Sequence, residues 1–324
     1  MSSSNDLLKA ITHTLLFKPD QYKELLEGVH QLHKLYAECT GIAAYSVTDK
    51  DMWLPSGNAV SPIKAAHCLL EFQRTAVFLR GIYKALLRLQ RDFPGEQLHI
   101  LYAGCGPYAT LVTPLTSMFT AAEITFHLVD VNPVSLDSAK RLYTAWHLDA
   151  YVAEYILTDA TTYRFPADGL FHLVISETML NALRKEPQVD IMLNLLPQLH
   201  PKAIFVPYAI TVSAWLLDCY QESSRHLHPD KEPDRISLGM LYRIGREEYE
   251  PHEKTILQIP EALGTCNSLH LLTHINTFED EVLDMYDSSL NLPLRIGEMN
   301  GYAGKKVAFT YQRGEKPGFI HEWE

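Results

Sequence analysis

Short apolar runs and helical hydrophobic patterns alternate through the middle of the chain. Four apolar runs, at residues 98–101, 124–129, 155–157 and 173–175, predict buried strands. Residues 134–146 and 189–199 repeat apolar side chains at helical spacing, a further helical pattern begins near Thr110, and a last strand ends by residue 212. This alternation predicts an α/β fold, a doubly wound, Rossmann-like parallel sheet with helices on both faces.

Helical patterns also precede this sheet region. Apolar side chains recur at helical spacing over residues 6–40, and Ser61, which is followed by a proline, marks the start of a second helix expected over residues 62–90. The intervening segment 41–62 contains a loop with a tryptophan. We therefore predict an N-terminal helical region, residues 1–94, in which segment 41–62 forms a lid over a binding site of the sheet domain.

The composition of the chain changes after Leu217. Residues 218–235 are polar and contain two prolines, which is typical of a loop or a mobile arm. Short β patterns follow at residues 236–244, 254–259, 268–278, 292–296 and 306–312. The chain is therefore expected to continue from its N-terminal region into a sheet domain over residues 95–217 and a small β-rich C-terminal region over residues 218–324.

Composition and charge exclude several classes of partner. Of the 324 residues, 28 are Lys or Arg and 39 are Asp or Glu, so the formal net charge is −11. A field of this sign repels nucleic acid and anionic membrane surfaces and favours a cationic ligand. The five cysteines are scattered, which indicates a reducing compartment, and no segment resembles a membrane span or a secretion signal. We expect a cytoplasmic protein without nucleic-acid or membrane partners.

The stretch LHILYAGCGPYAT joins the first predicted strand to a glycine-rich turn. Gly104 and Gly106 allow the backbone to turn tightly and to approach a ligand without an intervening Cβ. Asp130 ends the next strand, close to the spacing at which an acidic residue binds the ribose hydroxyls of a nucleoside. Two further strands end in Asp159 and Glu177, at the edge where open parallel sheets bind ligands. These residues predict a nucleotide-type site and no metal site.

Three motifs, LYAGCGPYATL, HLVDVNP and YILTDA, together resemble those of class I S-adenosylmethionine-dependent methyltransferases, over residues 95–212. The resemblance implies S-adenosylmethionine as the cofactor. The glycine turn would pass its backbone along the methionine part, the second strand end would hold the ribose, and the third would contact the adenine edge. In this order, the implied cofactor residues are Gly104, Cys105, Gly106, Asp130, Asp159 and Ala160. Tyr102 departs from the pattern, because an acidic residue is common at this position.

The segment ISETMLNALRKEPQVD is similar to the double-glutamate loop of the protein arginine methyltransferases. That family carries Ser-Glu-x-Met after this strand and a second glutamate nine residues beyond the first, which Glu177 and Glu186 match. Upstream, Arg74-Thr75 resembles an arginine–threonine pair whose arginine reaches the cofactor's carboxylate. The resemblance implies that Glu177 and Glu186 are catalytic and that Arg74 binds the cofactor. The family's paired-tyrosine motif and Thr-His-Trp segment have no counterpart here, which implies a different acceptor pocket.

Two carboxylates at one small site suit a planar cation, because a guanidinium donates paired hydrogen bonds to carboxylate oxygens. We therefore expect N-methylation of a guanidino or amino group on a small molecule, an amino acid or a peptide. Two other hypotheses stay open. A dinucleotide-dependent oxidoreductase would use the same glycine turn and Asp130, and a catalytically silent subunit with the methyltransferase fold would bind a partner instead. A homodimer also stays open.

Overall fold

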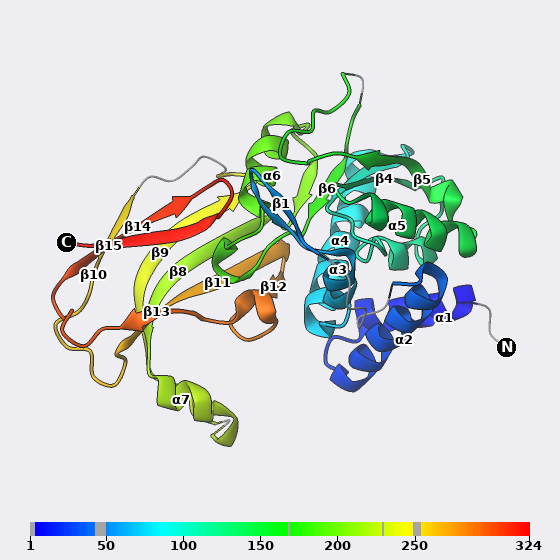
Figure 1. Ribbon diagram of the computed structural model, residues 1–324. Coiled ribbons are helices and arrows are strands. Elements are labelled where there is room, and N and C mark those ends of the chain that lie inside the picture. Colours follow the sequence, from blue (N-terminus) through cyan, green and yellow to red (C-terminus); the bar gives the residue numbers. More distant parts are fainter. Residues whose placement is uncertain (1–3, 43–49, 168, 229, 249–253) are drawn as a thin grey trace.

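The computed structural model describes residues 4–42, 50–167, 169–228, 230–248 and 254–324 (Figure 1). Part of the predicted lid, residues 43–49, lies outside these described residues. The N-terminal helices and the parallel sheet form one end of the molecule, and antiparallel strands form the other, so that the first helix and the last strand lie far apart (Figure 1).

A five-stranded parallel sheet confirms the predicted fold class. Its spatial order is β5-β4-β3-β6-β7. The strands are β3 (Leu98–Ala103), β4 (Ile124–Asp130), β5 (Val152–Leu157), β6 (Leu173–Ser176) and β7 (Ile204–Val206). The chain first moves outward from β3 through β4 to β5 and then returns to β6 on the other side of β3. Ligands of open parallel sheets bind at such a reversal, outside the carboxyl ends of the strands.

The helices that accompany this sheet begin largely where the sequence predicts them. They are α1 (Ser4–Phe17), α2 (Tyr22–Thr40), α3 (Pro62–Cys68), α4 (Phe72–Asp92), α5 (Pro133–Ala145) and α6 (Gln188–Leu195), with the short 3₁₀ helices η2 (Asp149–Tyr151), η3 (Asn181–Leu183) and η4 (Leu196–Gln198). Ser61 caps α3 by accepting a hydrogen bond from the backbone of Lys64, as its N-cap position predicts. Among the described residues, none of the helices combines the length and the apolar character of a membrane span.

The prediction of a helix that begins near Thr110 is wrong. Residues 106–112 form turns, and only the 3₁₀ helix η1 (Thr113–Ser117) follows. Ala109 has a φ of 43°, in the left-handed region, so a right-handed helix cannot extend back through this residue. Pro114 has no N–H and so removes the first backbone hydrogen bond that a helix starting at Thr110 would make.

Two further expectations for the N-terminal region need correction. The helix expected over residues 62–90 is broken into α3 and α4, and the Thr75 hydroxyl donates to the carbonyl of Leu69 in the break, at 3.1 Å. The described part of the expected loop contains a hairpin of β1 (Met52–Leu54) and β2 (Gly57–Ala59). Gly57, with a φ of 132°, provides a backbone conformation that other residues rarely adopt.

The C-terminal part is β-rich, as expected. One sheet has the order β12-β11-β8-β9, with β13 also paired to β11, and a second has the order β10-β14-β15. Their elements are β8 (Ala209–Leu217), α7 (Cys219–Ser224), η5 (Arg225–Leu227), β9 (Arg235–Gly245), β10 (Thr255–Gln258), β11 (Ser268–Phe278), β12 (Glu281–Leu283), η6 (Ser289–Asn291), β13 (Leu294–Glu298), β14 (Lys306–Gln312) and β15 (Gly318–Trp323). Strand β8 pairs with β9 and β11, so the antiparallel region begins before the boundary expected at residue 217. An apolar run by itself does not reveal whether its strand pairs in parallel.

Helix α4 connects the two halves of the molecule. Arg80 donates to a carboxylate oxygen of Glu281 at 2.7 Å, and both side chains are largely buried. Gly81 lies so close to Thr277 that a Cβ would collide with its side chain. These contacts fix α4 between the parallel sheet and β11, and they thereby fix the position of Arg74 near its start.

Candidate active site

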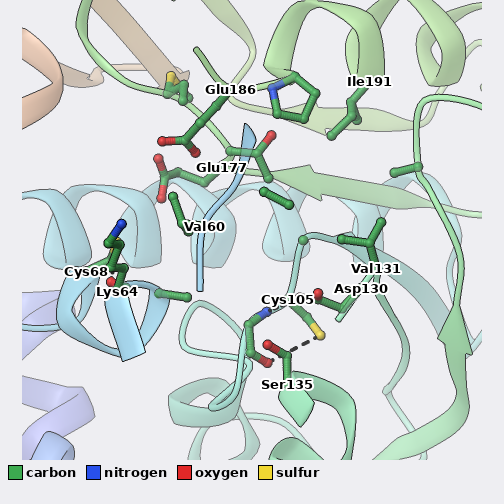
Figure 2. Close-up of a pocket in the computed structure, with 18 of the residues that line it drawn as sticks. Val60, Lys64, Cys68, Cys105, Asp130, Val131, Ser135, Glu177, Glu186 and Ile191 are labelled. Carbon is green, nitrogen blue, oxygen red and sulfur yellow. Dashed lines mark hydrogen bonds between the residues drawn. The ribbon is translucent and has the colours of Figure 1, made fainter. Parts of the chain in front are cut away.

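The predicted site residues converge on one cavity of about 560 Å³ (Figure 2). It lies at the carboxyl ends of β3, β4 and β6, and the β1–β2 hairpin, α3 and α4 contribute its other walls. The nine predicted residues that line it are Arg74, Gly104, Cys105, Gly106, Asp130, Asp159, Ala160, Glu177 and Glu186. Tertiary folding therefore brings together residues that the sequence spreads over more than 100 positions.

The glycine turn forms a narrow cradle at one end of the cavity. Gly104 and Gly106 have φ values of 75° and 65°, and a Cβ on Gly104 would collide with the methyl group of Thr178. One carboxylate oxygen of Asp130 accepts the N–H of Gly106 at 2.9 Å, and the other accepts the N–H of Asn132 at 2.8 Å. These contacts hold the acid that ends β4 directly against the turn.

The ionisation of Asp130 reflects this environment. Burial raises the pKa of its carboxyl group, while the backbone N–H groups of Asn132 and Gly106 oppose the rise. At the next strand end, the side chain of Asp159 accepts the N–H of Thr161 at 2.8 Å, which fixes a tight turn beside Ala160. A glycine turn with an accessible backbone, flanked by the hydrogen-bonded carboxylates of Asp130 and Asp159, fits a nucleoside that carries an extended amino-acid chain.

The opposite end of the cavity is acidic. Glu177 follows β6 directly, Glu186 lies in the loop between η3 and α6, and Figure 2 shows their carboxylates pointing toward one another. The side chain of Glu177 is 8% exposed, and Glu186 is 7% exposed. Burial, with repulsion from Glu177 as the next cause, raises the pKa of Glu186 to about 8. The two acids expected from the nine-residue spacing therefore share one buried space.

Arg74 forms ion pairs with two carboxylates. One terminal nitrogen donates to Glu71 at 3.0 Å, and the other forms a short hydrogen bond with an oxygen of Glu177. Burial raises the pKa of the Glu177 carboxyl, and the guanidinium of Arg74 opposes that rise. The second oxygen of Glu177, Oε1, is buried and has no hydrogen-bond partner within the described residues. Arg74 therefore orients Glu177 and leaves one of its oxygens available for a ligand.

The loop that carries Glu186 is strained. Ala182, Leu183 and Lys185 have φ values of 56°, 53° and 69°, which side-chain-bearing residues rarely adopt. Both backbone groups of Lys185 are bonded to distant segments: its carbonyl accepts the N–H of Asn58 at 2.7 Å, and its N–H donates to the carbonyl of Pro317 at 2.8 Å. Strain of this kind persists where the surrounding structure holds it, and here it sets the direction of Glu186.

Several residues that line the cavity were missed by the sequence analysis. They are Asp51, Asn58, Lys64, Glu71 and Ser289. Glu71 could have been found, because it lies one helical turn before Arg74. Asp51 and Asn58 lie in segment 41–62, the predicted lid, but nothing in that segment marks these two side chains individually. Lys64 and Ser289 carry no local signal: Ser289 comes from η6 in the C-terminal part, and its N–H and hydroxyl both donate to Glu71 at 2.8 Å.

The cysteines of the cavity are not suited to nucleophilic catalysis. Burial raises the pKa of the Cys68 thiol to about 11, although Arg74 opposes the rise, and burial also raises the pKa of Cys105. Both side chains are therefore neutral thiols at physiological pH, whereas a nucleophile requires the thiolate.

No family model and no curated protein matches this sequence. Among solved structures, the chain is similar to a PRMT1 enzyme–prozyme heterotetrameric complex with AdoHcy from Trypanosoma brucei. The TM-score is 0.53, the sequence identity is 12%, and the match covers 81% of this chain and 92% of that chain. The likeness shows that the chain shares the overall fold of that structure, a Rossmann-like parallel sheet followed by a β-rich C-terminal part.

Proposed function

We propose that this protein is an S-adenosylmethionine-dependent methyltransferase that N-methylates a guanidino or amino group on a small molecule, an amino acid or a peptide. The observation that carries the proposal is the geometry of one cavity. A nucleoside-type cradle at Gly104, Gly106 and Asp130 lies at one end, and the facing acids Glu177 and Glu186 lie at the other. The fold of the solved complex with AdoHcy supports the same cofactor.

The residues of the cavity fit this cofactor and a cationic acceptor. Bound S-adenosylmethionine would supply an electrophilic methyl group, which needs alignment more than activation. The free oxygen of Glu177 accepts an acceptor N–H and orients the nitrogen. Glu186, in its ionised form, accepts a second hydrogen bond and takes up the proton that the acceptor nitrogen loses. The negative charge of both carboxylates also stabilises the positively charged acceptor beside the positively charged sulfonium of the cofactor.

The role of Asp130 can be tested by calorimetry with S-adenosylhomocysteine. Asp130→Ala removes the carboxylate proposed to bind the ribose and is expected to weaken binding by about 1–3 kcal/mol, the range for a hydrogen bond to a charged group and for the desolvation penalty of an unpaired partner. Asp137→Ala, which changes an exposed acid of α5, is the matched control and should bind as the wild type does. Equal affinity of Asp130→Ala and Asp137→Ala for S-adenosylhomocysteine would contradict the proposal that Asp130 binds the ribose.

The raised pKa of Glu186 predicts a pH dependence. Because only its ionised form accepts a proton, kcat/KM for methylation of L-arginine or ethylguanidine is expected to rise between pH 7 and pH 9, with an inflection near pH 8. The inflection of kcat should lie at lower pH, since bound cations stabilise the carboxylate. Glu186→Gln should abolish the inflection in both profiles. An unchanged inflection in this variant would assign the titration to another group.

We also propose that the chain forms a homodimer. The arm formed by α7 and η5 projects away from the rest of the molecule (Figure 1). It exposes two large apolar side chains, Tyr220 at 80% and Leu227 at 66%. Exposed apolar side chains on a projecting, otherwise polar segment favour burial against another surface, and the solved complex of similar fold is itself an oligomer.

A further inference from the structure

Two buried oxygens in the cavity have no hydrogen-bond partner among the described residues. One is Oε1 of Glu177, and the other is Oδ1 of Asn58 in strand β2. Asn58 is 7% exposed, so water does not readily replace the missing partner. Buried polar atoms are nearly always paired, because an unpaired one is destabilising. Two orphan acceptors in one cavity therefore indicate a ligand that donates several hydrogen bonds.

The orientation of the Asn58 amide is fixed by its neighbours. Its nitrogen Nδ2 donates to a carboxylate oxygen of Asp51 at 3.2 Å, and an ionised carboxylate can only accept. Asp51 is itself held by the ammonium group of Lys64 at 2.7 Å and by the N–H of Ser61 at 3.0 Å. The amide cannot flip without losing its partner, so the oxygen is the free end.

Asn58 is also attached to the loop that carries Glu186. Its backbone N–H donates to the carbonyl of Lys185, the residue next to Glu186, at 2.7 Å. The approach is close because the preceding residue is Gly57, whose Cβ, if present, would lie 2.7 Å from that carbonyl. Strand β2, which ends just before the labelled Val60 in Figure 2, therefore runs beside the loop that carries Glu186.

We propose that Asn58 is a specificity-determining residue that accepts a third hydrogen bond from the acceptor and thereby selects a guanidino group over an amine. This inference rests on the proposed function and deepens it. A guanidinium presents five N–H donors in a planar fork, enough to serve Glu177, Glu186 and Asn58 together. An ammonium is compact and has three donors, and a hydroxyl has one, so neither spans the three acceptors equally well.

The experiment measures the binding of ethylguanidine and ethylamine to protein saturated with S-adenosylhomocysteine, by calorimetry. The wild type is expected to prefer ethylguanidine, and Asn58→Ala is expected to weaken its binding about tenfold or more, the loss typical of one hydrogen bond to a charged group. The affinity for ethylamine should change less, so the preference for ethylguanidine over ethylamine should be smaller in Asn58→Ala than in the wild type. Alanine keeps the backbone N–H that bonds to Lys185. Asn58→Leu, which preserves the side-chain volume more closely, should behave alike.

Ser56→Ala is the matched control. Ser56 lies in the same hairpin, is 8% exposed and also has a hydroxyl without a partner in the described part of the chain, but it does not line the cavity. It should bind both probes as the wild type does. If the wild type prefers ethylguanidine and both Asn58 variants keep that preference, the inference is overturned while the proposed function stands. If S-adenosylhomocysteine binds the wild type but neither probe does, the proposed acceptor class fails, and the role of Asn58 fails with it.

Discussion

Glu177→Gln is expected to lower the rate of methyl transfer to a guanidino acceptor by about two to four orders of magnitude, the effect of losing one positioned electrostatic or proton-accepting group. Glutamine keeps the shape of the side chain and can still accept a hydrogen bond from Arg74, but it carries no charge. The glycine turn proposed to hold the cofactor lies at the other end of the cavity, so the affinity for S-adenosylhomocysteine should change little. Transfer of labelled methyl to L-arginine and arginine-containing peptides measures the loss.

Glu186→Gln is expected to have an effect of similar size, and the two effects should not add. If both carboxylates grip one guanidinium, the double variant should be little worse than the more damaging single variant, because residues that act as a unit lose their function together. Glu154→Gln, which neutralises an exposed acid of β5, is the control and should retain full activity. If all of these proteins, including the wild type, bind the cofactor but none transfers a methyl group, a catalytically silent subunit would be favoured.

Full activity in Glu186→Gln would change the interpretation of the site. Glu177 would then be the sole catalytic acid, and the reason to expect a guanidine would be lost. An amine or a hydroxyl would become the better acceptor to test. This outcome is informative because Glu186 is held by a strained loop whose function would then require another explanation.

Arg74→Met is expected to destabilise the protein by about 3–5 kcal/mol at pH 8, the range for breaking a buried ion pair on one side. The substitution leaves Glu177 buried without its cationic partner, and Glu71 also loses a contact. Urea unfolding measures the change in free energy. Arg88→Met on the same helix removes an exposed pair with Asp92 and should have an effect below about 1 kcal/mol.

The double variant Arg74→Met/Glu177→Gln distinguishes a lost charge partner from lost packing. Removing both charges relieves the uncompensated carboxylate, so this protein should regain part of the stability that Arg74→Met loses. No recovery would assign the loss to packing around the Arg74 side chain. The ion pair would then contribute little to folding.

The same substitution tests the proposed contact between Arg74 and the cofactor's carboxylate. Arg74→Met should lower the affinity for S-adenosylhomocysteine. The affinity for 5′-methylthioadenosine, which lacks the amino-acid part, should stay close to that of the wild type. A uniform loss for both ligands would show that the arginine acts only by holding the site together.

Much of the sheet and of the cavity end formed by the glycine turn could be predicted because their signals are local. A strand that is buried on both faces has an apolar run, and its carboxyl end is marked by the next small or acidic residue. Asp130 and Glu177 were found in this way. The double-glutamate spacing added Glu186, which has no signal of its own in the segment LRKEPQ.

Local backbone geometry was predicted less well. The pattern from Thr110 reads as helical, but Pro114 lacks a backbone N–H that an α-helix would use there, and only a short 3₁₀ helix forms. The long pattern over residues 62–90 does not show the break after Cys68, where the hydroxyl of Thr75 accommodates the turn. In both cases local backbone constraints outweigh the helical periodicity of the side chains.

The sequence by itself determined the succession of strands in the parallel sheet, the acids at the strand ends and the glycines of the cradle, because each depends on residues that are neighbours along the chain. Only the tertiary structure decided what surrounds Glu186. Asn58 and Pro317 reach its loop from segments that are distant in sequence, and Ser289 reaches Glu71 from the C-terminal part. Such contacts depend on how helices and sheets pack against one another, and the pattern of residues within any one element does not encode them.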